Sequence, residues 1–167
     1  TDWMNEFYKP CNTTTEHNVS VSGGSDIADF YVSGRYYGSD GIYKVGNENY
    51  KKYDVRAKGT VRIRPWIKIT NNLSMSIQNS VQPRTQNGTV VQKYMQHCLQ
   101  PMAPIKNPDG NWSPASAISG YAAFSDGNNY MTDKRTYVRE KVSLDIDIVK
   151  DILKFQADYA YNYTRRQ

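Results

Sequence analysis

Three aspartates near the end of the chain come closest to a catalytic arrangement. Asp145 and Asp147 are two positions apart, so they share one face of an extended strand, and Asp158 follows on the next extended segment. Paired carboxylates can act as acid and base in glycoside hydrolysis. These three, however, belong to a regular row of polar residues, which explains them without catalysis. Neither histidine lies near a nucleophile motif, so we do not expect an enzyme.

The thiol and imidazole groups do not form a metal-ligand pattern. His17 and His97 are far apart, and the neighbour of His97, Cys98, would point to the opposite face of a strand. We therefore expect no metal and no cofactor. The two cysteines, Cys11 and Cys98, are compatible with a disulfide or with free thiols, because an even count of two does not decide between them.

The charge balance argues against a nucleic-acid-binding protein, although the sum is basic. The net charge is +5 and the isoelectric point is about 9.1. The basic residues are interleaved with Asp and Glu throughout the chain, with no basic block and no zinc-ligand spacing. We read these Lys and Arg side chains as a solvated polar face.

Six segments alternate between apolar and polar residues with the period of a β-strand. The clearest is Tyr53 to Arg64, where Val55, Val61 and Ile63 alternate with charged residues. No apolar run is long enough for a transmembrane helix. The predicted strands cover approximately residues 15–22, 28–38, 50–64, 66–78, 135–148 and 152–164.

The length of the strands and their connections favour a membrane barrel over a soluble protein. Several segments reach the ~9–11 residues that a tilted strand needs to cross a bilayer. Short turns alternate with long connections, as in outer-membrane barrels. The predicted fold class is therefore all-β, an antiparallel meander of about six long strands from a transmembrane β-barrel. The alternative is a soluble β-sandwich that binds carbohydrate, with the apolar rows as its core.

The longest connection, about residues 80–134, carries several aromatic side chains that we expect to be exposed. They could stack on a sugar or contact a partner protein, or they could instead hold the loop to itself. Trp112 is the first candidate for such a contact, and the full set of candidates is Trp112, Tyr121, Phe124 and Tyr130.

A set of short motifs is distributed along the chain: Thr1-Asp2-Trp3, residues 17–26, 30–33, 41–44, 49–56, Pro65-Trp66-Ile67-Lys68-Ile69 and Asn107-Pro108-Asp109-Gly110-Asn111-Trp112. Together these motifs resemble the SusC/RagA family of TonB-dependent transporters, in the region that follows the plug domain. The resemblance extends over essentially the whole chain and is strongest at the hairpin around Gly23 and Gly24.

The resemblance implies a 22-stranded barrel in the outer membrane with an N-terminal plug inside. It also implies energy supplied through TonB and a SusD-like surface lipoprotein that captures glycans or peptides. The chain would then be a fragment, carrying the second to seventh barrel strands without the plug or the remaining strands. Thr1, with no initiator Met or signal peptide before it, agrees with this expectation. Six strands would leave open edges, which lipid does not tolerate.

The same register makes residues 1–14 the end of an extracellular loop and residues 80–134 a second one. Cys11 and Cys98 would then lie on the same side of the membrane, which favours the disulfide. The charged rows would face the lumen, where they would contact the plug or line the substrate route, or pair with one another across strands. These lumen-facing candidates are Asp54, Arg56, Lys58, Arg62, Lys68, Asp145, Asp147, Lys154 and Asp158.

Overall fold

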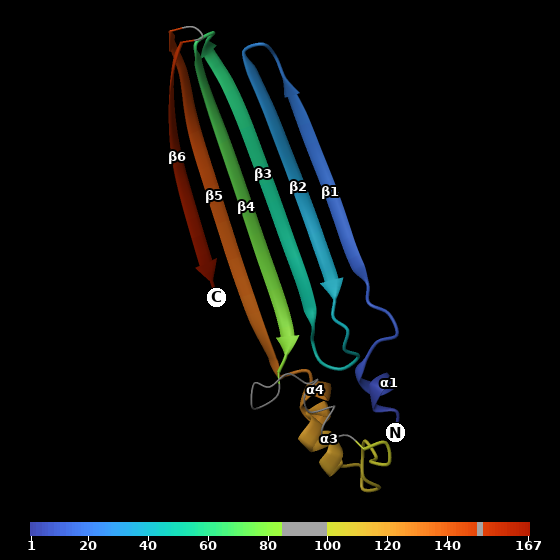
Figure 1. Cartoon of the computed structure of the whole chain (residues 1–167). Coiled ribbons are helices and arrows are strands. Elements are labelled where there is room, and N and C mark those ends of the chain that lie inside the picture. The colour runs from blue at the N-terminus through green and yellow to red at the C-terminus, as the bar shows by residue number, and fades with distance from the viewer. Residues whose placement is uncertain (85–99, 150–151) are drawn as a thin grey trace. The chain divides into compact units, whose positions relative to one another are not determined.

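The computed structural model describes residues 1–84, 100–149 and 152–167. Within these residues, six strands lie side by side in chain order and form one sheet, from β1 to β6 (Figure 1). Neighbours in such an up-and-down order are antiparallel, as the paired residues of β5 and β6 illustrate. The predicted all-β antiparallel meander is therefore confirmed. A β-sandwich requires two packed sheets, whereas the described residues form one.

Each strand has at least 11 residues, enough to span a bilayer. β4 and β5 extend about five residues beyond the predicted strand ends at 78 and 135, because backbone pairing continues where the side-chain alternation has already faded. The strand bounds are β1 Thr14–Gly24, β2 Ala28–Asp40, β3 Asn49–Arg64, β4 Ile67–Pro83, β5 Tyr130–Val149 and β6 Leu153–Arg166.

The register between β5 and β6 sorts the side chains by polarity. Val142 lies opposite Tyr159, and Ile146 lies opposite Phe155, whereas Asp147 lies opposite Lys154. Because successive side chains alternate between the two faces of a sheet, this register places apolar rows together on one side and polar rows on the other.

The turn between β1 and β2 depends on Ser25 and Gly24. The Ser25 hydroxyl accepts hydrogen bonds of 3.3 Å from the backbone N–H groups of Ile27 and Ala28. The Ser25 N–H donates to the Ala28 carbonyl over 2.6 Å. A β-carbon on Gly24 would lie 2.8 Å from the Ala28 carbonyl oxygen. Only glycine therefore fits this close approach of the two strands without a shift of the backbone.

The chain divides into two compact units, which we describe separately. The sheet unit consists of Thr15–Gly38, Lys51–Asn79 and Lys134–Gln167. The helical unit consists of Thr1–Thr14, Ser39–Tyr50 and Ser80–Asp133. It contains α1 (Trp3–Phe7), α3 (Pro114–Ser119) and α4 (Tyr121–Ser125). None of the described helices is long and apolar enough to cross a membrane.

The helical unit has an aromatic core that was not predicted. Phe7 is completely buried, and its ring centroid lies 5.1 Å from that of Tyr121 and 6.5 Å from that of Phe124. Trp3 packs edge-on against Tyr121 at 5.6 Å and donates from its ring nitrogen to the carbonyl of Gln100. The first 14 residues and the long connection thus fold together, although about 100 residues separate them in sequence.

Candidate functional site

The sheet unit leaves the apolar side of its strands uncovered. Val19 is 74% exposed, Ile63 55% and Tyr159 67%. The apolar residues found buried in the described ranges all lie in the helical unit, so the sheet unit has no apolar core of its own. Contiguous apolar surface of this extent marks a membrane or an interaction surface.

Aromatic rings gather on this apolar side. His17 stacks on Tyr36 at 6.2 Å, and Tyr36 lies 5.2 Å from Tyr53, so one line of rings crosses β1, β2 and β3. Tyr161 and Tyr163 lie on the same side of β6 and are 49% and 43% exposed. Amphipathic rings of this kind are typical of the boundary between lipid and water.

Two polar residues interrupt the apolar side, and the structure brings them together. Asn71 lies between Ile69 and Leu73 in the apolar row of β4, and Glu140 lies in the apolar row of β5. The Asn71 amide donates a hydrogen bond of 3.1 Å to the Glu140 carboxylate. The two residues therefore satisfy each other where a single polar group would have no partner.

The opposite side of the sheet unit carries cross-strand ion pairs. Every Asp and Glu on the polar side of its described strand residues has a Lys or Arg partner, and all but one of these pairs join neighbouring strands. The pairs are Arg35–Glu16, Arg62–Asp29, Lys52–Asp54, Lys68–Asp145, Lys141–Asp158 and Lys154–Asp147, at 3.0–3.7 Å. Their side chains are 28–71% exposed, so solvent screens each pair and its contribution to stability is small. Their effect is to balance charge along the polar side.

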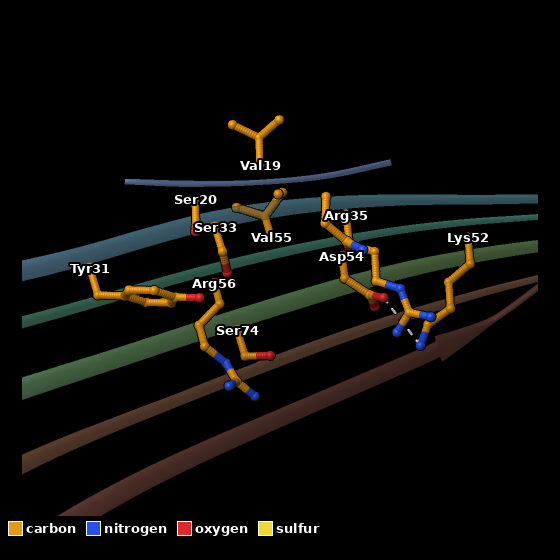
Figure 2. Close-up of a pocket in the computed structure, with 12 residues that line it drawn as sticks. Val19, Ser20, Tyr31, Ser33, Arg35, Lys52, Asp54, Val55, Arg56 and Ser74 are labelled. Atoms are coloured by element: carbon orange, nitrogen blue, oxygen red, sulfur yellow. Dashed lines mark ion pairs between the residues drawn. The ribbon is translucent and has the colours of Figure 1, made fainter. Parts of the chain in front are cut away.

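A hollow of about 490 Å³ lies on this polar side, over β1 to β4. Figure 2 shows Ser33, Arg35, Asp54, Arg56 and Ser74 on one side of the strands, with Val19 pointing to the other. The dashed line marks the Lys52–Asp54 pair. Among the described residues, the Arg56 guanidinium has neither an ion pair nor a hydrogen bond, so the hollow contains a free cationic group.

A second hollow, of about 340 Å³, contains the aspartates that came closest to a catalytic arrangement. Asp145 and Asp147 both line it, but each is paired with a lysine, Lys68 at 3.3 Å and Lys154 at 3.7 Å. Asp158 does not line this hollow and pairs with Lys141. The structure therefore brings two of the three carboxylates to one hollow, and each of them is already paired.

The predicted exposure of the loop aromatics is wrong for two of the four. Tyr121 is 7% and Phe124 2% exposed, because the N-terminal segment covers them with Trp3 and Phe7. Trp112 is half-buried against Tyr121, with the Lys106 ammonium 4.8 Å from the centre of its ring. Tyr130, the first residue of β5, is 52% exposed. The alternative, that rings hold the loop to itself, fits only the contact of Tyr121 with Trp112, because Tyr121 and Phe124 also pack against Phe7 of the N-terminal segment.

The Cys11–Cys98 disulfide stays a prediction. Cys11 is exposed, and Cys98 lies outside the described residues. Sequence reasoning also missed Arg64, which lines the second hollow without a partner among the described residues. The signal was present, since Arg64 continues the charged row of β3 by one step beyond Arg62.

No protein-family model matches the sequence. The chain is similar to TonB-dependent receptor P3 of Formosa agariphila, with 30% identity over 90 residues. The matched segment covers 53% of this chain and 9% of that much longer receptor. This similarity supports a relationship of the chain to TonB-dependent receptors.

Proposed function

We propose that this chain is part of the wall of an outer-membrane β-barrel that imports nutrients with energy delivered through TonB. One observation carries the proposal: the sheet unit has a bare apolar side, and the opposite side is ion-paired. A lipid-facing surface and an aqueous interior need this division of side chains. The similarity to a TonB-dependent receptor supports the same reading.

The finer assignment is to the SusC/RagA type. It rests on the hairpin around Gly23 and Gly24 and on its spacing to Gly41 and Trp66. In this assignment the parent protein has a 22-stranded barrel and a plug, and the helical unit is exposed at the cell surface. A SusD-like lipoprotein delivers glycans or peptides to it. The chain carries no catalytic role.

Trp112 and Tyr130 are the loop residues proposed to contact substrate or the lipoprotein. Tyr130 is exposed, and Trp112 still presents part of its ring beside Lys106. Trp and Tyr side chains are favoured at interfaces, because each combines a large apolar ring with a polar group. In the full-length protein, Trp112→Ala or Tyr130→Ala should lower substrate or lipoprotein binding. Unchanged uptake and lipoprotein binding in both variants would rule this role out.

The first test is an immunoblot of outer-membrane fractions with antibody against the segment around Trp112, with and without boiling. We expect a band several times larger than 19.1 kDa that shifts on heating, as barrels do. A soluble band at 19.1 kDa would refute the membrane assignment. Uptake of labelled oligosaccharide in cells with and without an inner-membrane proton gradient then tests the dependence on energy.

A further inference from the structure

The apolar rows of four strands have the same length, counted from the short turns. They cover residues 53–63 on β3, 67–77 on β4, 138–148 on β5 and 153–163 on β6. Only Gly59, Asn71 and Glu140 interrupt them. Ten residue steps span roughly 34 Å of strand. At a tilt of about 40° this is roughly 26 Å across the membrane, close to the apolar height of an outer-membrane barrel.

Positive charge on this side of the sheet begins where the apolar rows end. Within the described part of the sheet unit, the Lys and Arg residues that share the side of the apolar rows are Lys51, Lys134 and Arg165. All three are exposed and lie beyond the row ends that are farther from the short turns. Arg165 follows Tyr163 by one step on the same side, and Lys51 lies one step beyond Tyr53. The apolar rows therefore give way to cations at one level.

Two of these cations lie on neighbouring strands. Thr136 lies directly opposite Arg165, and the backbone groups of Lys134 and Gln167 exchange two hydrogen bonds of 2.9 and 3.1 Å. Lys134 and Arg165 are therefore diagonal neighbours on one side of β5 and β6, with their β-carbons roughly 7–8 Å apart. Long side chains at this spacing reach a single anion together, and Thr136 lies on the same side.

The charge of this cation pair is not balanced within the described strands. Glu140 is the acid that shares its side of the sheet, and its carboxylate already accepts a hydrogen bond of 3.1 Å from Asn71. Neither Lys134 nor Arg165 forms an ion pair with a residue of the ranges that the structure describes. The balancing anion must therefore come from outside these strands.

The surroundings of the pair suit a phosphate group that is attached to a lipid. An Arg binds phosphate with parallel hydrogen bonds, a Lys adds a point charge, and a Thr hydroxyl donates to a remaining oxygen. Tyr163 and Tyr161 lie one and two steps from Arg165 on the same side, and they are 43% and 49% exposed. A dissolved anion would gain nothing from these rings, whereas a lipid would place its chains against them.

We propose that Lys134, Arg165 and Thr136 form a binding site for the phosphate group of a lipid in the outer leaflet. The site rests on the proposed function, in which the apolar rows face lipid and the short turns are periplasmic. Lys51 lies at the same level but outside this site, because β4 separates β3 from β5.

Native mass spectrometry of the full-length protein, purified in detergent and mixed with lipid A, tests the site. The double variant Lys134→Gln with Arg165→Gln removes both charges at exposed positions. Arg139→Gln is the matched control, because it removes an exposed Arg from the polar side of β5, opposite Asn162. The heat-dependent mobility shift first establishes that each variant is assembled. Lipid A without its phosphates and inorganic phosphate are the two comparison ligands.

We expect the wild type and Arg139→Gln to bind lipid A equally, and the double variant to bind it about 25-fold more weakly. Each cation near a lipid surface contributes about a factor of five. Lipid A without phosphates should bind the wild type as weakly as lipid A binds the double variant.

Equal binding of lipid A by the double variant and the wild type would overturn the inference. So would equal binding of lipid A without phosphates, because acyl-chain contact alone would then explain it. Displacement of lipid A by millimolar inorganic phosphate would also overturn it, since the site would then serve a dissolved anion. Absence of the full-length protein from the outer membrane would instead refute the proposed function.

Discussion

The Asn71 amide lies 3.1 Å from the Glu140 carboxylate, within the mainly apolar rows of β4 and β5. Each residue is polar in a mainly apolar row, and the hydrogen bond between them gives each a partner. Removing one partner should therefore cost more than removing both, since an unpaired polar group against lipid keeps its full desolvation penalty.

Asn71→Leu in the full-length protein should lower the free energy of unfolding by about 1–3 kcal/mol, because Glu140 loses its donor. The double variant Asn71→Leu with Glu140→Leu should recover much of this loss. Asn72→Leu, a similar change at the neighbouring position on the polar side, is the control. Urea titration of the heat-dependent mobility shift measures all three. Additive effects in the double variant would contradict the coupling.

A new positive charge should distinguish the two sides of the sheet. Val55→Arg and Leu144→Arg place a charge on the apolar side, at a cost of roughly 2–4 kcal/mol near the bilayer midplane. Both should reduce the amount of heat-modifiable barrel in outer-membrane fractions. Gln156→Arg adds the same side chain opposite Asp145 on the polar side and should assemble normally. Equal assembly of all three would disprove the assignment of the faces.

Gly24→Ala should impair the β1–β2 hairpin, because the new β-carbon would lie 2.8 Å from backbone atoms of Ala28 and Asp29. Relief requires a backbone shift that typically costs about 1–3 kcal/mol. Gly34→Ala is the matched control on β2, where no atom lies within 4 Å of the added carbon. Unfolding in urea measures the difference, and a Gly34 variant as unstable as the Gly24 variant would refute the steric argument.

Phe7→Ala should loosen the helical unit, because the ring is completely buried between Tyr121 and Phe124. The expected loss is about 3–5 kcal/mol, the usual cost of removing a buried Phe. Limited proteolysis should then cut the segment after Gln100 sooner. Met4→Ala, on the same helix but 63% exposed, should behave as the wild type. Identical cleavage of Phe7→Ala and wild type would refute the role of this core.

The same unit should loosen at alkaline pH. Burial, with the nearby Glu6 carboxylate, raises the pKa of the Tyr121 hydroxyl above its usual 10.0. The protonated form is favoured in the folded unit, so this stabilisation is complete below pH 10 and is lost as the pH rises through the raised pKa. Tyr121→Phe should remove this alkaline step in tryptophan fluorescence. If the alkaline step is unchanged in that variant, the step belongs to another titrating group.

Alternation of apolar and polar residues was enough to predict the sheet, because strand periodicity depends only on neighbouring residues. Tyr53 to Arg64 shows this most clearly. The same local signal gave the correct rows on β5 and β6, including Glu140 as an interruption. It could not predict that Asn71 is the partner of Glu140, because that pairing depends on the register between β4 and β5. The two residues are 69 positions apart in sequence.

The helical unit was missed for the opposite reason. Its core joins Phe7 to Tyr121 and Phe124, and no periodic pattern links such distant segments. Local signs existed at α3, where Ser113 accepts a hydrogen bond from the Ser116 N–H, Pro114 begins the helix and Gly120 ends it with φ of 81°. A helix of six residues is too short for the spacing of its apolar residues to be recognised.

None of the described apolar residues of the sheet unit is buried, and this has a consequence for how the sequence can evolve. A side chain in a packed core must match the shape of its neighbours, whereas one that faces fluid hydrocarbon needs only to be hydrophobic. Positions such as Val55, Ile63 and Phe155 should therefore exchange freely among Val, Ile, Leu and Phe in related proteins. Gly24, fixed by close backbone contact, should hardly vary. We therefore expect rapid sequence change along the apolar side of each strand and little change at the β1–β2 hairpin, as in a surface that contacts a fluid rather than a packed protein core.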